Sequence, residues 1–118
     1  MNPIRRERLA AAGVDVEDAL ARFLGSEAML ERFWGKFLED QNYARLEEAV
    51  RDQDWTAALA ASHTLKGMCG NLSLRRLFLL FTRQVAAFRS GDYEAAAAQM
   101  DEIAGAYEAA VSAIRSAP

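Results

Sequence analysis

The two prolines of this chain stand at positions 3 and 118, so residues 4–117 lack the ring that breaks helices. Alanine, the strongest helix former, supplies 24 of the 118 residues. Valine, isoleucine and threonine, which favour strands, together supply only 11. The sequence therefore predicts an all-α fold.

The composition also excludes several classes of function. One cysteine cannot form an internal disulfide, and one histidine without a cysteine cluster cannot build a typical zinc site. A formal net charge of −3 argues against an electrostatic nucleic-acid binder. No apolar run approaches the roughly 18 residues of a membrane span, and the first residues lack the apolar core of a signal peptide. We therefore expect no metal site, no nucleic-acid partner and no membrane segment, in a chain of the reducing cytoplasm.

Turn-forming residues divide the chain into helical segments. The dividing residues are Gly13, Gly25, Gly91 and the pair Asn71 and Ser73. The expected helices span about residues 4–11, 15–24, 27–40, 42–53, 55–71, 74–90 and 92–115. Candidate N-caps are Ser26, Ser73 and Asp92. Because the junction at 40–42 holds neither proline nor glycine, the helices 27–40 and 42–53 could form one kinked rod.

The last expected helix carries a stripe of apolar residues spaced alternately by three and four positions, which is typical of packing in a left-handed bundle. The stripe consists of Tyr93, Ala96, Met100, Ile103, Tyr107, Ala110 and Ile114. Short connections make consecutive helices antiparallel neighbours. We therefore predict an antiparallel up-and-down four-helix bundle with short N-terminal helices. This bundle forms one domain over residues 1–118, with an N-terminal extension of about 1–25 and a bundle of about 26–115. We expect the chain to be a monomer.

The helix expected over residues 55–71 carries the only histidine. With Leu65 set at zero and about 100° per residue, His63 falls at about 160°, nearly opposite the apolar face. That apolar face consists of Ala58, Ala61, Leu65, Met68, Cys69 and Leu72. Small residues surround His63 on the outer face within about 60°, at spacings of three, four and seven positions. They are Ala60, Gly67 and Gly70.

A lone histidine on a helix is usually a satisfied core or surface residue, and the wheel argues against the core alternative. A glycine in an exposed helix costs roughly 1 kcal/mol relative to alanine, so the small outer face indicates that another protein must approach the imidazole. Gly70 has an alternative explanation as part of a C-cap, and Gly35 and Gly105 also fall inside expected helices.

An exposed neutral imidazole is a competent nucleophile at cytoplasmic pH. Lys66, one turn further along, can offer its ammonium to an anion held on the ring, although an exposed lysine is often only solvated. Leu59, one turn before His63, adds an apolar contact beside it. Leu59, Ala60 and Gly70 are thus candidate partner-docking residues.

The run His63-Thr64-Leu65-Lys66-Gly67, followed by Asn71-Leu72 and Leu77, resembles the signature of histidine phosphotransfer (HPt) domains. The segment from Ala19 to Asp40 and the lead-in Asp54-Trp55 are also similar to that family. The resemblance implies a phosphocarrier rather than an enzyme. In that role His63 is the phosphoacceptor, Lys66 helps to hold the phosphoryl group, and Gly67 leaves room for the partner.

The same resemblance implies that the partners are receiver domains of response regulators and of a hybrid histidine kinase. The receiver supplies the magnesium ion and the acidic residues for transfer, so the chain needs no cofactor. Two departures from the family pattern concern local packing and partner choice. Ser73 stands where the family often has glycine, and Gln84-Val85 stands where a Leu-Glu pair is common.

Two other functions compete with this interpretation. The dimerisation helix of a histidine kinase also exposes a histidine on a bundle, but an acidic residue usually follows that histidine, whereas Thr64 follows here. The chain also lacks a Gly-rich phosphate loop. A non-catalytic helical adaptor is the second alternative, with Leu79, Leu80 and the arginines at 75, 76 and 83 as candidate contact residues.

Overall fold

The computed structural model describes residues 1–116, and these residues contain eight α-helices and no strand. The helices are α1 (Pro3–Ala11), α2 (Val16–Arg22), α3 (Glu27–Glu39), α4 (Asn42–Arg51), α5 (Trp55–Asn71), α6 (Arg75–Arg89), α7 (Tyr93–Ala98) and α8 (Met100–Arg115). None of the helices described is long and apolar enough to cross a bilayer.

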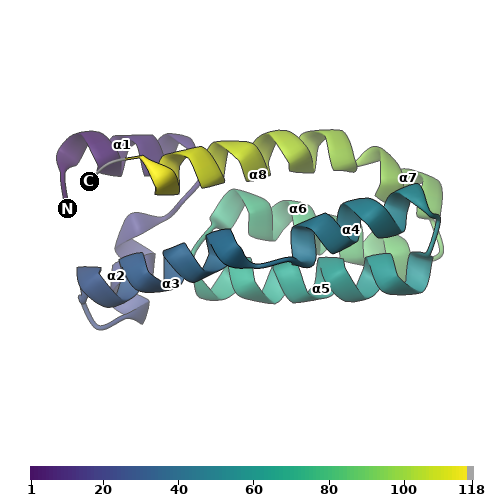
Figure 1. Ribbon diagram of the computed structural model, residues 1–118, viewed down its shortest axis with the longest axis horizontal. Coiled ribbons are helices and arrows are strands. Elements are labelled where there is room, and N and C mark those ends of the chain that lie inside the picture. Colours follow the sequence, from purple (N-terminus) through teal and green to yellow (C-terminus); the bar gives the residue numbers. More distant parts are fainter. Residues whose placement is uncertain (117–118) are drawn as a thin grey trace.

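Four rods make up the bundle: α3 with α4, then α5, then α6, then α7 with α8 (Figure 1). Helix α5 packs against α4 on one side and α6 on the other, whereas α8 packs against α6, α3 and α1. Helix α8 therefore lies diagonally across the bundle from α5. The molecule measures 42 × 23 × 21 Å, which fits rods laid along one axis. The predicted antiparallel four-helix bundle with short N-terminal helices is confirmed.

The chain bends between α3 and α4 because Asp40 takes an extended backbone conformation, with ψ of 143°. The Asp40 carboxylate then accepts hydrogen bonds from the Asn42 main-chain amide and side-chain amide, at 2.8 and 3.1 Å. The two helices follow one line along the molecule (Figure 1). The two expected helices are therefore separate, and the alternative of one kinked helix is wrong because the backbone leaves the helical conformation at Asp40.

The expectation of a single helix over 92–115 is wrong, because the chain breaks at Gln99 into α7 and α8. In a continuous helix the Ala96 carbonyl would accept from the Met100 amide. Here that carbonyl accepts from the side-chain amide of Gln84 on α6, at 3.1 Å. A side chain from another helix thus inserts into the hydrogen-bond ladder where the break occurs.

Helix α1 is fastened to the bundle by Arg5, whose side chain is buried at 3% exposure. Its guanidinium donates to the carbonyls of Ala113, Ile114 and Ser116 at the end of α8, at 3.1, 3.1 and 2.5 Å. It also forms two hydrogen bonds to the Glu31 carboxylate on α3, at 3.0 and 2.5 Å. One side chain therefore binds carbonyls at the C-terminal end of α8 and ties three helices together.

Replacing Arg5 by methionine keeps the apolar stem and removes every one of these hydrogen bonds. We expect Arg5→Met to lower the free energy of unfolding by about 2 to 3 kcal/mol, because the α8 carbonyls and Glu31 lose their partner. Urea unfolding measures the change. Arg6→Met is the matched control, since the Arg6 side chain is 41% exposed and its contact to Glu17 is long, at 3.6 Å. Equal stability of the two variants would contradict the role of Arg5 in holding α1, α3 and α8 together.

Candidate functional site

Helix α5 starts at a well-defined point. The Asp54 side chain accepts a hydrogen bond from the Ala57 amide at 3.1 Å, and so caps the helix. The Trp55 ring stacks on Tyr93 at 5.1 Å between centroids and lies 6.2 Å from the Phe88 ring. These contacts fix the rotation of α5 at its first turn, and with it the direction in which later side chains point.

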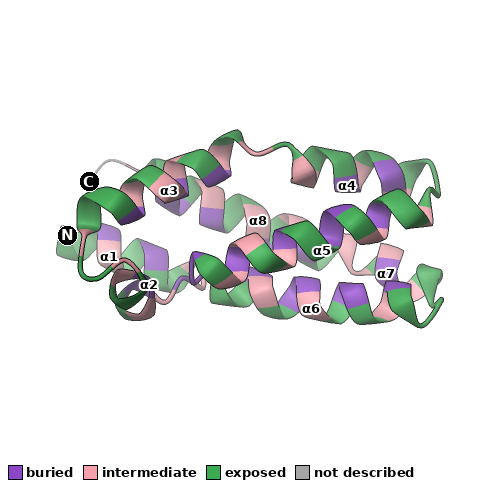
Figure 2. Cartoon of the chain, turned by 90° about the horizontal axis from the view of Figure 1, so that it is seen from below, coloured by how far each residue is buried: buried purple, intermediate pink, exposed green. Residues whose placement is uncertain are grey.

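Helix α5 lies between α4 and α6, with buried and exposed residues alternating along it (Figure 2). The side expected to face the core does so: Ala58, Ala61, Leu65, Cys69 and Leu72 are buried and Met68 is half-buried. The opposite side is open. Its exposed residues are Ala60, His63, Thr64 and Gly67. The structure thus places the histidine where the helical wheel predicted it.

The His63 imidazole makes no hydrogen bond within residues 1–116. The neighbouring Thr64 hydroxyl is turned back to its own helix and donates to the Ala60 carbonyl at 3.0 Å. The other nucleophile of the helix, Cys69, is buried, and its burial raises the pKa of the thiol far above the ordinary value. His63 is therefore the exposed side chain of α5 that offers a nucleophilic ring nitrogen.

The two glycines beside His63 have different structural reasons. A Cβ built on Gly67 meets no atom within 4 Å, so packing inside this chain does not require glycine there. A Cβ on Gly70 would lie 3.0 and 3.1 Å from two ring carbons of Phe78 on α6. Close packing of α5 on α6 therefore explains Gly70, which lies inside α5 rather than in a C-cap.

Lys66 and Leu59 are both half-buried. No acidic side chain within residues 1–116 lies at ion-pair distance from Lys66, so its ammonium is available to an external anion. Leu59 packs against the hydrophobic core, which leaves only part of its side chain for a partner. The structure thus brings Lys66 and Leu59 to within about one turn of His63.

Two hollows flank the exposed side of α5. One, of about 430 Å³, lies against α4 and includes Ala60 and Thr64 in its lining. The other, of about 330 Å³, lies against α6 and α2. Its lining residues are Asp18, Arg22, Gly67, Cys69, Gly70, Asn71, Ser73, Arg75 and Phe78. The contribution of Asp18 and Arg22 from α2 was missed in the sequence, because 45 residues separate Arg22 from Gly67.

Ser73 does not cap α6, so that prediction is wrong. Leu74 precedes the helix, and Ser73 is buried with a left-handed backbone, at φ of 57°. A left-handed conformation costs a non-glycine residue roughly 1–2 kcal/mol. The Ser73 hydroxyl donates to the Asp18 carboxylate at 2.7 Å, which offsets part of that cost. This hydrogen bond, and then the one from Arg22, lowers the pKa of Asp18. Ser73 thus anchors α2 beside the hollow.

Gln84, on α6, connects this helix to α5 inside the bundle. Ser62, next to His63, is buried and donates to the Gln84 side-chain carbonyl at 2.8 Å. Gln84 is also fully buried and donates to the Ala96 carbonyl at 3.1 Å. The pair holds the back of the His63 turn against α6 with its polar groups satisfied.

Replacing Gln84 by leucine leaves the Ser62 hydroxyl buried without its partner. We expect Gln84→Leu to lower the free energy of unfolding by about 1 to 3 kcal/mol. Adding Ser62→Ala removes the unpaired hydroxyl, so the double variant should regain part of the loss. Chemical unfolding of both variants checks this, and a double variant less stable than Gln84→Leu alone would show that the hydroxyl finds another partner.

The comparison with protein families decides what this bundle is. The model of the Hpt domain matches residues 28–117, most of the chain. This chain belongs to the Hpt domain family. Hpt domains are phosphocarriers of phosphorelays that interact with receiver domains. The resemblance inferred from the His63 motif is thereby confirmed. No curated protein and no solved structure matches the chain.

The family match begins at residue 28, so it leaves out helices α1 and α2. Both are nevertheless built into this Hpt domain. Arg5 ties α1 to α8, and the Asp15 amide donates to the Ser73 carbonyl at 2.9 Å, which holds the start of α2 at the end of α5. The N-terminal segment thus forms part of the surface beside Gly67, one turn from His63.

Proposed function

We propose that His63 carries the phosphoryl group of this Hpt domain. It accepts the group from the aspartyl phosphate of one receiver domain and passes it to the aspartate of another. The observation that supports the proposal is the exposed position of the chain's only histidine. Its ring has no hydrogen-bond partner within residues 1–116, and the small residues Ala60 and Gly67 are exposed on the same helix.

The transfer needs little from this chain besides the nucleophile. A ring nitrogen of neutral His63 donates its lone pair to phosphorus, and the bond between phosphorus and the aspartyl oxygen breaks, so that the partner's aspartate leaves as a carboxylate. The proton on the other ring nitrogen is released to solvent as the phosphorylated ring becomes neutral. Transfer to the second receiver follows the same steps in reverse.

The neighbours of His63 take supporting roles. Lys66, half-buried and without an acidic partner in the described residues, places a positive charge one turn from the phosphoryl group. The open space over Gly67 admits the backbone of the receiver. Leu59, Ala60 and Gly70 form the docking surface around the ring. The receiver brings the magnesium ion and the acidic residues, and the domain acts as a cytoplasmic monomer between a hybrid histidine kinase and a response regulator.

Incubation with phosphorylated receiver domains tests the proposal. The expected result is a phosphoryl label on this chain that is lost in acid and kept in alkali, as the phosphorus–nitrogen bond of a phosphohistidine requires. A chain that stays unlabelled with a broad panel of receivers, but still binds one of them, would instead support the non-catalytic adaptor.

A further inference from the structure

The charges of this chain are distributed very unevenly. Residues 55–91, which form α5, α6 and their connections, contain none of the 17 acidic residues. The same stretch contains five of the 14 basic residues, namely Lys66, Arg75, Arg76, Arg83 and Arg89. The rest of the chain therefore carries nine basic and all 17 acidic residues, a formal charge of −8 against +5 for this stretch.

The two hollows beside α5 differ in charge. On the α4 side, the hollow beside Ala60 is lined by Glu48, Asp52 and Asp54, with Arg45 as its one basic residue. On the α6 side, the hollow beside Gly67 is lined by Arg22, Arg75 and Asp18. Lys66 adds a further cation on α5 itself. The hollow on the α4 side of α5 is thus mainly acidic, and the hollow on the α6 side is mainly basic.

Arg22 and Arg75 line the basic hollow from two different helices. Arg22 comes from α2, which lies outside the family match, and Arg75 starts α6. Their side chains are 49% and 60% exposed. Each contacts one carboxylate, Arg22 with Asp18 at 2.9 Å and Arg75 with Asp15 at 3.4 Å. Exposed pairs of this kind are weak, and each guanidinium keeps further N–H groups for a partner.

We propose that this basic flank, which α2 completes with Arg22, selects the receiver partner of the domain, and that the preferred receiver has an acidic docking surface. The proposal rests on the proposed phosphotransfer function. Opposite charges at the edge of an interface mainly raise the association rate and fix the orientation of the partner. The acidic flank on α4 repels the same acidic surface, so a receiver docks in one orientation over His63.

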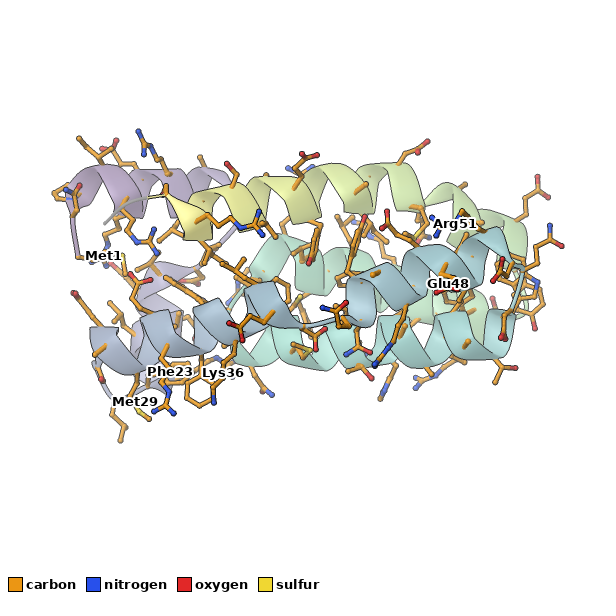
Figure 3. The ribbon with its side chains drawn as sticks, viewed as in Figure 1. Met1, Phe23, Met29, Lys36, Glu48 and Arg51 are labelled. Carbon is orange, nitrogen blue, oxygen red and sulfur yellow. The ribbon has the colours of Figure 1, made fainter. Side chains whose placement is uncertain are left out.

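The experiment separates loading of His63 from docking of the receiver. Phosphoramidate, a small phosphoryl donor, loads the wild-type chain and the double variant Arg22→Glu/Arg75→Glu without any receiver. Transfer from each loaded protein to a panel of receivers is then timed at low and high salt. The matched control is Arg51→Glu/Arg115→Glu, with the same change of charge. Arg51 and Phe23, the residue that follows α2, lie toward opposite ends of the molecule (Figure 3). Arg115 is on α8, the helix diagonally across the bundle from α5.

We expect the Arg22→Glu/Arg75→Glu variant to load normally and to transfer about tenfold more slowly to acidic receivers, with a weaker dependence on salt. The control variant should transfer within about twofold of wild type, because neither Arg51 nor Arg115 lines the basic hollow. Equal transfer rates for wild type and the Arg22/Arg75 variant would overturn the proposal. The proposal would also be overturned if wild type and the control variant bind single-stranded DNA and the Arg22→Glu/Arg75→Glu variant does not. The basic surface would then bind nucleic acid rather than a receiver. A wild-type chain that takes no label at all would instead refute the proposed function.

Discussion

His63→Gln is expected to abolish phosphoryl labelling of this domain completely, while the free energy of unfolding stays within about 0.5 kcal/mol of wild type. Glutamine has a similar length but no nucleophilic ring nitrogen, so no phosphoryl transfer to this position is possible. The stability of the fold should not change, because the His63 side chain is exposed and makes no hydrogen bond within residues 1–116. Incubation with a phosphorylated receiver, followed by chemical unfolding of the same sample, measures both quantities.

Ala57→Gln is the matched control for this variant. Ala57 is exposed on α5 in the turn that Asp54 caps, so the control adds a glutamine to the same helix and keeps His63. It should be labelled like wild type. An acid-labile label that persists in His63→Gln would contradict the assignment of His63.

Gly67→Gln should slow phosphoryl transfer by about 10- to 100-fold while stabilising the fold by up to about 1 kcal/mol. The gain in stability follows from replacing a helix-interior glycine at a position where a Cβ meets no atom within 4 Å. The slower transfer follows because a bulky side chain in a closely packed contact costs about 1–3 kcal/mol. Single-turnover transfer between the loaded domain and a receiver gives the rate, and thermal unfolding gives the stability.

Gly105→Gln is the control for the steric part of this argument. Gly105 is also exposed inside a helix with no atom within 4 Å of an added Cβ, but it lies on α8, diagonally opposite α5. Both variants should gain stability, and only Gly67→Gln should lose transfer rate. If both transfer like wild type, the space over Gly67 is not needed by the receiver.

The helices themselves could be predicted from the sequence with small errors. Ser26 and Asp92 cap α3 and α7 as expected, accepting from the Met29 and Ala95 amides at 3.2 Å in both cases. These contacts join residues three positions apart, so the local sequence contains both partners. The break at Gln99 could not be predicted in the same way, because its cause is the amide of Gln84, 12 residues before the carbonyl that it contacts.

In the candidate site, too, features that depend on nearby residues could be predicted from the sequence, and features that depend on distant residues could not. The exposure of His63 followed from the spacing of apolar residues on one helix, and the structure agrees. The role expected for Ser73 as an N-cap was wrong, because its hydroxyl contacts Asp18, 55 residues away in the sequence. Likewise, the sequence suggested that Gly70 is small so that a partner can approach His63. In the structure, the Phe78 ring on the next helix limits the space at Gly70.

The sequence by itself determined that the chain is helical, where its helices lie, which side of α5 is buried, and that one histidine stands on the open side among small residues. Each of these depends on residues a few positions apart, and the regular rise and rotation of an α-helix relates such residues whatever surrounds them. Only the tertiary structure decided that α2 lines the hollow beside Gly67, that Ser62 is held by Gln84, and that an acidic and a basic hollow lie on the two sides of α5. These features depend on pairs of residues far apart in the chain, which come together only when the helices pack.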